Sequence, residues 1–263
     1  MLVKQIWTAN PYRNFNYLIA CPQTGEALAI DPLDSATCLQ AAKDEGWEIT
    51  QILNTHEHHD HIGGNQAVVD ATGAKVLAHA KAASLIPGMF RGLVAGDIIK
   101  VGKTVELEAL DTPGHTFCHI CLRSHTDQPA LFSGDTLFNA GAGNCHNGGS
   151  VPDLFRTFDE QLSRLPDNTL VYPGHDYIDN NLRFTLSREP SNTAAQQLLD
   201  KVNGQDVNHP FVSTMATERE VNTFFRLGQQ QVVAELRKSF PDLPNKPDAP
   251  TVFAKLRELR NSW

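Results

Sequence analysis

The first two thirds of the chain alternate short apolar runs with amphipathic stretches. Apolar residues recur at helical spacing in Ser35–Glu45, in Asn65–Thr72 and over residues 152–165. Short strand-like runs lie between them, at residues 51–54, 107–110, 130–132 and 169–172. Such alternation favours sheets covered by helices. We therefore predict an α/β (α+β) domain over residues 1–172.

The strand pattern stops after His175. Helical spacing then dominates, over residues 178–187, 194–202, 228–240 and 251–260, and Thr217 to Glu220 has the spacing of a capping box. Prolines separate these stretches, at positions 210, 241, 244, 247 and 250. We predict a second, α-helical domain over residues 173–263.

Residues 55–61 read Thr-His-Glu-His-His-Asp-His and contain four candidate metal ligands, His56, His58, Asp60 and His61. They follow a strand-like run, at the edge of a sheet where α/β folds place ligand sites. His56 and His58 are two apart and can point the same way, whereas Asp60 and His61 follow a bend. One ion cannot readily take all four, so the cluster predicts two metals. A solvated His-rich loop is the alternative.

Three further candidate ligands follow strand-like runs elsewhere in the chain. His115, Asp135 and His175 each come directly after a glycine, which allows the backbone to aim a side chain inward. Taken singly, each could be an ordinary turn residue. Together with the first cluster they make a set that is sufficient for two ions sharing one carboxylate.

This pattern resembles the metallo-β-lactamase superfamily, whose motif is His-x-His-x-Asp-His followed by isolated His, Asp and His residues. Within it the chain is most similar to the glyoxalase II (hydroxyacylglutathione hydrolase) family. The similarity lies in residues 16–19, 29–32, 55–64, 112–116, 131–140, 172–181 and 256–260. The resemblance implies an αββα sandwich of two mixed sheets, with the metals at one edge and a C-terminal helical subdomain.

The resemblance also implies a role for each ligand. His56, His58 and His115 would hold one metal, Asp60, His61 and His175 the second, and Asp135 would bridge both. Asp60 and Asp135 would thus be catalytic residues as well as ligands. We expect two divalent metal ions, Zn²⁺ first, with Fe or Mn²⁺ as alternatives, because imidazole and carboxylate suit all three.

The resemblance also implies the reaction, hydrolysis of a small-molecule thioester that is a glutathione conjugate. A water between the ions would have a lowered pKa and would attack the polarised carbonyl. The thiol that leaves has a pKa of about 8.5, so no strong general acid is required. The expected products of S-(2-hydroxyacyl)glutathione, typically S-lactoylglutathione, are glutathione and a 2-hydroxy acid.

Arg257, Arg260 and Tyr177 are candidate substrate contacts. The two arginines are three apart on a predicted helix and could offer forked donors to a carboxylate. In the family resembled, a basic pair here holds the glycine carboxylate of glutathione, and a tyrosine contacts the peptide. A solvated helix end and a packed aromatic are the alternatives.

Residues 142–149 depart from the family pattern. Asn144 and His146 in this segment are also candidate substrate contacts, although the family usually has a Lys or Arg in place of the first and an aromatic in place of the second. Loss of the cation would weaken glutathione binding about tenfold or more, or the site prefers another acyl thioester. Cys145 could be read as a nucleophile, although a metal-bound water makes one unnecessary.

Other uses of the same ligands remain open. A related thioesterase or lactonase would act on a substrate without glutathione, and a persulfide dioxygenase would use one iron. A metal-binding regulatory protein without catalysis would lack ligands, and none is missing. Cys118-x-x-Cys121 could indicate redox chemistry, but its strand-like neighbours point the two side chains to opposite faces.

Composition narrows the partners. The 263 residues carry a net charge of −8, which argues against nucleic-acid binding. No apolar stretch approaches the roughly 18 residues of a membrane span, and the N-terminus lacks a signal-peptide pattern. Five scattered cysteines suit a reducing compartment. We expect a soluble cytoplasmic protein, a monomer, with neither a nucleic acid nor a membrane as partner.

Overall fold

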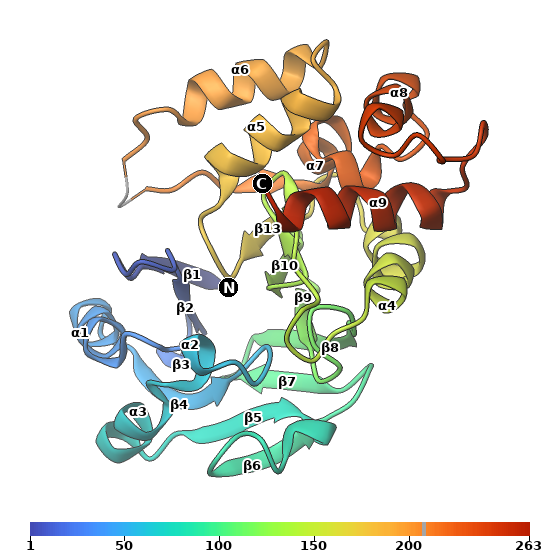
Figure 1. Ribbon diagram of the computed structural model, residues 1–263. Helices are drawn as coiled ribbons and strands as arrows, with labels where there is room; N and C mark the ends of the chain where they lie inside the picture. The colour runs from blue at the N-terminus through green and yellow to red at the C-terminus, as the bar shows by residue number, and fades with distance from the viewer. Residues whose placement is uncertain (207–208) are drawn as a thin grey trace. The chain divides into compact units, whose positions relative to one another are not determined.

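The computed structural model describes residues 1–206 and 209–263, which form two compact units. Unit 1 contains residues 1–112, 118–134 and 172–176, and unit 2 contains residues 113–117, 135–171 and 177–263. Figure 1 labels the elements of both units. The domain boundary that we place after residue 172 stays a prediction.

Unit 1 contains two sheets. The first has the strand order β1-β2-β3-β4-β5-β6, antiparallel from β1 to β3 and parallel from β3 to β6. Its strands are β1 (Leu2–Trp7), β2 (Phe15–Ala20), β3 (Glu26–Ile30), β4 (Glu48–Leu53), β5 (Lys75–His79) and β6 (Met89–Leu93). The predicted run at residues 51–54 is the end of β4.

The second sheet has the order β14-β13-β10-β9-β8-β7, in which β14 (Ser213–Thr214) belongs to unit 2. Its other strands are β7 (Ile98–Val101), β8 (Val105–Asp111), β9 (Ile120–Ser124), β10 (Ala130–Gly134) and β13 (Leu170–Pro173). The two sheets pack face to face, because the ring of Tyr17 on β2 lies 5.6 Å, edge-on, from the rings of both Phe132 and Tyr172. The strands predicted at residues 107–110 and 130–132 are confirmed within these bounds, and the strand predicted at 169–172 is confirmed as β13, which begins one residue later.

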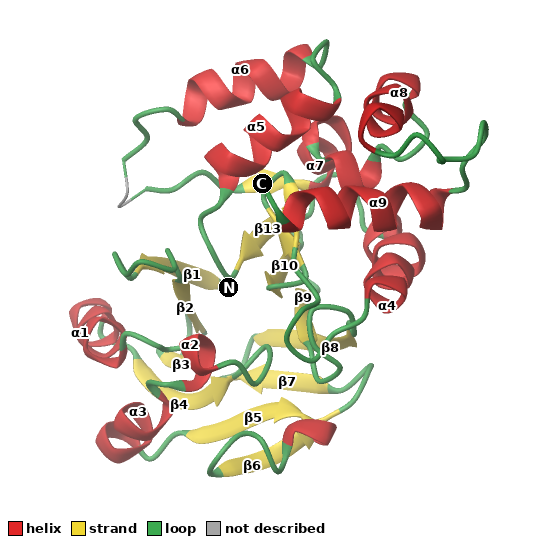
Figure 2. Ribbon diagram, in the orientation of Figure 1, coloured by secondary structure: helices red, strands yellow, loops and turns green. Residues whose placement is uncertain are grey.

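Helices α1 (Ser35–Glu45) and α3 (Asn65–Thr72) cover the other face of the first sheet (Figure 2). Successive strand residues alternate between the two faces. Leu18 therefore packs in a core with Cys38 of α1 and Val68 of α3, while Tyr17 faces the second sheet. The bounds of both helices are those predicted. The remaining short helices of unit 1 are α2 (His59–Ile62) and η1 (Ala80–Ala82).

Unit 2 is mainly helical. Its elements are β11 (Leu137–Phe138), β12 (Gly141–Ala142), α4 (Val151–Arg156), η2 (Thr157–Gln161), η3 (Leu162–Arg164), α5 (Ile178–Arg188), α6 (Thr193–Val202), β14 (Ser213–Thr214), α7 (Met215–Val221), η4 (Thr223–Phe225), α8 (Gln230–Ser239) and α9 (Ala249–Asn261). Phe158, Phe224 and Phe253 are buried and pack ring against ring in its core. The five predicted helical stretches are confirmed, with a π-helical turn at Thr157–Gln161.

Two expectations for this region were wrong. A strand occurs after residue 173, because β14 pairs with Leu170 and Val171 at the start of β13. The capping box does not begin at Thr217 either: helix α7 starts two residues earlier, and Thr214 is its N-cap, accepting a hydrogen bond from Thr217 N. Among the described residues, no helix is both long and apolar enough to cross a membrane.

Candidate active site

The loop after β4 bends where the sequence predicts. His58 has extended backbone and is the N-cap of α2, so His56 and His58 precede the bend while Asp60 and His61 lie within the helical turn. Asn54 donates from Nδ2 to His61 O over 3.2 Å, which ties the turn back to the end of β4. The four candidate ligands therefore come from both sides of one bend, and the ring centroids of His56 and His61 lie only 4.1 Å apart.

Asp60, His61 and His175 form the first ligand group, and their ligand atoms lie within 4.8 Å of one another. Nε2 of His61 is 3.2 Å from Nε2 of His175. Oδ2 of Asp60 lies 3.6 Å from the first of these nitrogens and 3.5 Å from the second. Both imidazoles are buried. This spacing suits a divalent ion with one carboxylate and two imidazole ligands.

Each imidazole of this group is held at its other nitrogen. Nδ1 of His61 lies 2.8 Å from Oδ2 of Asp31, and Nδ1 of His175 donates to the main-chain oxygen of Tyr12 over 2.7 Å. Because an acceptor faces each Nδ1, the ring protons reside there. Each Nε2 is left with the lone pair that a metal requires.

Asp31 is also linked to His56, through hydrogen bonds of the Thr55 hydroxyl. The hydroxyl of Thr55 donates to Oδ2 of Asp31 over 2.6 Å and lies 3.1 Å from Nδ1 of His56. Since the hydroxyl proton is used on Asp31, its oxygen accepts from His56 Nδ1. Nε2 of His56 then faces Nδ1 of His58, at 3.0 Å.

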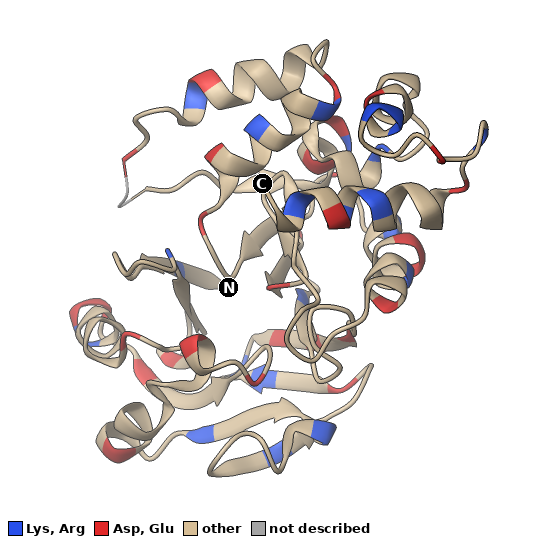
Figure 3. Ribbon diagram, in the orientation of Figure 1, with Lys and Arg blue, Asp and Glu red and all other residues tan. Residues whose placement is uncertain are grey.

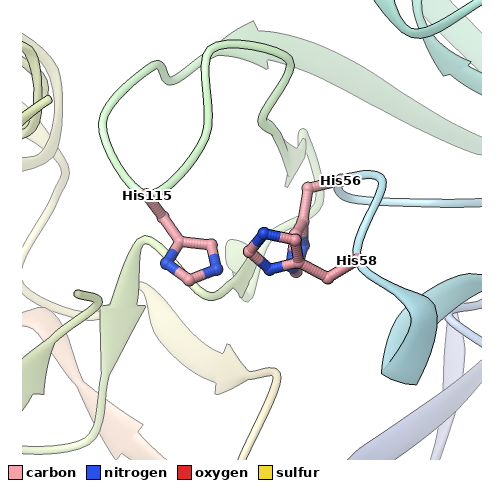
Figure 4. Close-up of side chains that lie close together, drawn as sticks. All are labelled: His56, His58 and His115. Atoms are coloured by element: carbon pink, nitrogen blue, oxygen red, sulfur yellow. The ribbon is translucent and has the colours of Figure 1, made fainter. Parts of the chain in front are cut away.

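His115 and Asp135 are the remaining two candidate ligands. Nδ1 of His115 donates to Asn144 O over 2.7 Å, and its Nε2 lies 3.6 Å from Oδ2 of Asp135. Ligand atoms within 4.8 Å of one another are found in two further groups: His56 with His58 and His115, and His56 with His61 and Asp135. Figure 4 draws the three imidazoles of the first of these.

All seven predicted ligands thus fall into groups with the donor chemistry of Zn²⁺, Fe or Mn²⁺ sites. Five imidazoles and two carboxylates are present, and no thiol is among them. Outer-shell acceptors fix the tautomer of His61, His115 and His175. The residues therefore fit two divalent metal ions.

Unit 2 contains a pocket of about 270 Å³ next to the start of α5 and the end of α9. It is lined by Phe138, Ala142, Asn144, His146, Tyr177, Asn180, Arg257, Arg260 and Asn261. All five residues predicted as substrate contacts are among them. Figure 3 shows basic and acidic positions interspersed along α9.

The two arginines are less free than the sequence suggested. Arg257 is 3% exposed, and its Nη1 donates to Ala142 O and Gly143 O over 2.6 and 3.0 Å. Nε and Nη2 of Arg260 both donate hydrogen bonds to Oδ1 of Asn181. Burial first, and then repulsion from Arg260, lower the pKa of Arg257 to about 10. An anionic ligand would relieve this unfavourable pairing of cations.

The other pocket residues have mixed surroundings. Tyr177 packs edge-on against Phe138 at 5.2 Å and also lines the pocket, and its contact with a substrate stays a prediction. Oδ1 of Asn144 accepts from His146 N. Burial raises the pKa of the neighbouring Cys145 to about 11, which keeps the thiol protonated and argues against a nucleophile.

The cysteines form no redox pair. No disulfide joins Cys118 and Cys121 in the described structure, and Cys118 lies before the first residue of β9 while Cys121 lies within it. Burial raises the pKa of Cys118, which makes its thiol less reactive. The alternative of redox chemistry at this pair therefore has no support.

Sequence reasoning missed three contributors to the site. Asp31 orients His61 and, through Thr55, His56. The main-chain oxygen of Tyr12 orients His175, and Asn14 donates from Nδ2 to the main-chain oxygen and Oδ2 of Asp60, both over 3.1 Å. A signal existed only for Asp31, a carboxylate directly after a buried strand at the same sheet edge.

Comparisons with known proteins agree with this geometry. Residues 13–175 match the metallo-beta-lactamase superfamily, and residues 176–263 match the hydroxyacylglutathione hydrolase C-terminus. The chain is 70% identical to hydroxyacylglutathione hydrolase of Polaromonas sp. and 63% identical to that of Nitrosococcus oceani, with 100% of each chain covered. It also resembles the crystal structure of ETHE1 from Myxococcus xanthus, with 26% identity and a TM-score of 0.68 over 100% of this chain and 99% of that one. The fold is thus the α/β metallo-β-lactamase fold with a C-terminal helical region, and the chain belongs to the hydroxyacylglutathione hydrolase family of the metallo-β-lactamase superfamily.

Proposed function

We propose that this protein is a thiolester hydrolase that cleaves S-(2-hydroxyacyl)glutathione, typically S-lactoylglutathione, to glutathione and a 2-hydroxy acid. The observation that carries the proposal is the presence of the His and Asp ligand groups together with an arginine-lined pocket. Relatives that share 70% and 63% of its residues have the name of this activity.

The proposed metal sites use the seven residues that the sequence singled out. One divalent ion is held by His56, His58 and His115, a second by Asp60, His61 and His175, with Asp135 shared. When bound, such ions lower the pKa of a water and polarise a carbonyl oxygen. We propose Zn²⁺ for both sites, with Fe and Mn²⁺ as the alternatives that the same donors accept.

The protein's own residues would orient the metal ligands and bind the substrate. Asp31 and Tyr12 O hold the ring protons of His61 and His175 away from the ligand nitrogens. We propose that Arg260 and Arg257 attract a carboxylate of the glutathione moiety, since both cations are partly desolvated in the pocket. The leaving thiolate needs no protein acid, because a thiol pKa of about 8.5 makes it a stable product near neutrality.

We propose that one chain suffices for this activity, since a single chain supplies every proposed ligand. Its five free cysteines suit a reducing compartment, and we propose the cytoplasm as its location.

The test is a panel of thioesters offered to purified protein whose metal content is measured by mass spectrometry. We expect two equivalents of metal and release of glutathione from S-lactoylglutathione, followed with a thiol reagent. A protein that holds two metals and cleaves another thioester, but leaves S-lactoylglutathione intact, would contradict the substrate. One that cleaves no thioester would contradict the reaction class.

A matched pair of variants tests the pocket. Arg260→Met removes a pocket cation, and a lost charge-assisted contact should raise KM for S-lactoylglutathione about tenfold while kcat changes little. Arg183→Met is the control, because Arg183 is exposed on α5 and paired only with Asp179 in the described structure. Equal KM values for the two variants would contradict the proposal that Arg260 binds the glutathione moiety.

A further inference from the structure

Residues 139–144, here called the Ala140 loop, contain a main-chain conformation that is unfavourable for a residue other than glycine. Ala140 has φ of +56°, in the left-handed region, although it is not a glycine. It lies between β11 and β12, which pair through Phe138 and Gly141. An L-residue in this region costs about 1 kcal/mol or more, so neighbouring contacts must stabilise it.

Glu218 on α7 makes one of these contacts and is itself fully buried. Its Oε2 accepts from Ala140 N over 2.9 Å and from Asn222 Nδ2 over 3.0 Å, and its Oε1 accepts from Ser213 Oγ over 2.6 Å. A buried carboxylate is unfavourable unless donors surround it. Here a titratable group that the proposed hydrolysis does not use is retained in the interior and directed at a strained main-chain N–H.

Other side chains hold the rest of the Ala140 loop. Asn181 donates to Asn139 O over 2.9 Å, and Asn222 donates to Gly141 O over 3.1 Å. Arg257 holds the next two main-chain oxygens, as described above. Glu218 and Asn222 are themselves hydrogen bonded, so the main-chain groups at Ala140 and Gly141 are held by one connected pair.

The far end of the Ala140 loop meets the proposed ligands. Asn144 O accepts the Nδ1 proton of His115 over 2.7 Å. A Cβ on Gly143 would lie 1.8 Å from Asp135 O and 3.3 Å from His115 Nδ1, so the loop packs directly on both residues. A displacement of this loop would therefore move the acceptor that sets the tautomer and orientation of His115.

We propose that Glu218 is a positioning residue for the hydrolytic site: it holds the left-handed turn at Ala140 and thereby the carbonyl of Asn144 that orients His115. The effect on hydrolysis rests on the proposed function, whereas the effect on His115 does not. In the described structure Glu218 accepts hydrogen bonds from Ala140, Ser213 and Asn222, none of which is a proposed metal ligand.

The experiment compares Glu218→Met, which removes the acceptors but keeps the length of the side chain, with Glu218→Gln, which keeps one acceptor oxygen. Glu189→Met is the matched control. Glu189 is also a buried carboxylate of unit 2, bonded to Arg226 and Asn192 rather than to the Ala140 loop. Its loss should destabilise the protein without moving His115.

The first measurement is the Nδ1 proton signal of His115 in metal-free, ¹⁵N-labelled protein. We expect a slowly exchanging proton in the wild type and in Glu189→Met, and its loss or broadening in Glu218→Met. The second is metal affinity against a competing chelator, which should fall about tenfold or more in Glu218→Met, the range found for outer-shell partners of metal ligands. Glu218→Gln should show a smaller fall, of about threefold.

An unchanged His115 signal and unchanged metal affinity in the Glu218 variants would overturn the proposal. So would equal losses in Glu218→Met and Glu189→Met, because these would show a purely structural role. If Glu218→Met does not fold, Glu218→Gln decides on the same readouts. A wild type that shows the His115 signal but does not cleave S-lactoylglutathione would contradict the proposed function and leave the positioning of His115 to be judged by the signal alone.

Discussion

Asp31 is the residue on which most of unit 1's ligand geometry depends. It is 2% exposed, has φ of +48°, and accepts from Thr55 N and Thr55 Oγ1 as well as facing His61 Nδ1. A strained backbone at a buried carboxylate is typical of a functional site. One side chain thereby sets the orientation of His61 and, through Thr55, of His56.

Asp31→Asn should lower metal affinity by about tenfold to a hundredfold, because an amide can present N–H rather than oxygen to His61 and favour the wrong tautomer. The measurement is chelator competition followed by metal analysis. Asp34→Asn is the control, since Asp34 only caps α1, where Asn is an equally good N-cap. Equal metal affinity in the two variants would contradict this role.

Glu218 also predicts a pH dependence of stability. Burial raises its pKa from 4.5 to about 7, against hydrogen bonds that lower it. The folded state therefore keeps a proton that the unfolded state loses, and the stability from this group is full below pH 4.5 and lost as pH rises through 7. From pH 5.5 to 8 the wild type should lose about 2 kcal/mol relative to Glu218→Gln.

The measurement is the free energy of unfolding of both proteins by urea at the two pH values. Glutamine does not titrate, so the difference between the proteins isolates residue 218. A difference that is constant, or that grows in favour of the wild type toward pH 8, would contradict the raised pKa.

At the residue scale, the sequence pointed to the candidate ligands that the structure brings together, but not to the groups that orient them. His56, His58, Asp60 and His61 are adjacent in sequence, so a local pattern reveals them. The partners of His175 and Asp60 are Tyr12 O and Asn14, more than a hundred and about fifty residues away along the chain. A main-chain oxygen has no residue signature, and Asn14 acts only because tertiary structure brings it there.

At the element scale, the end of a helix was predictable where the residue that ends it directly follows the helix in the sequence. Gly46 and Gly73 end α1 and α3 with φ of +69° and +70°, which glycine adopts without strain. The start of α7 was not predictable, because Thr214 and Thr217 are both of a residue type that is common at N-caps. Pairing of Ser213 and Thr214 with β13 decides between them, and this is a tertiary effect.

Thr214→Ala should therefore destabilise the protein by about 1 kcal/mol, the usual cost of losing an N-cap hydrogen bond. Thr217→Ala should cost less, because only its main-chain N–H is needed to satisfy the cap. Urea unfolding of the two variants gives the comparison. A larger loss for Thr217→Ala would restore the capping box that the sequence suggested.

At the scale of the whole molecule, the first ligand group joins distant parts of one unit. His61 follows β4 and His175 follows β13, and 114 residues separate them in the chain. An ion bound by both would close a long loop in the folded state that an unfolded chain does not close. The same ion would bind the folded form far better than the unfolded one, which couples metal binding to stability.

Removal of metal by a chelator should therefore lower the midpoint of thermal unfolding, and re-addition of Zn²⁺ should restore it. At a free metal concentration of 1,000 times Kd the stabilisation is about 4 kcal/mol, which is a shift of about 10 °C for a chain of this size. His175→Ala removes the distant ligand and should show a smaller metal-dependent shift than the wild type, because only the ion proposed at His56, His58 and His115 would then contribute. His209→Ala is the control, because His209 is an exposed histidine whose ion pair is with Asp206. Metal-independent melting of the wild type, measured by calorimetry, would show that this group does not hold an ion.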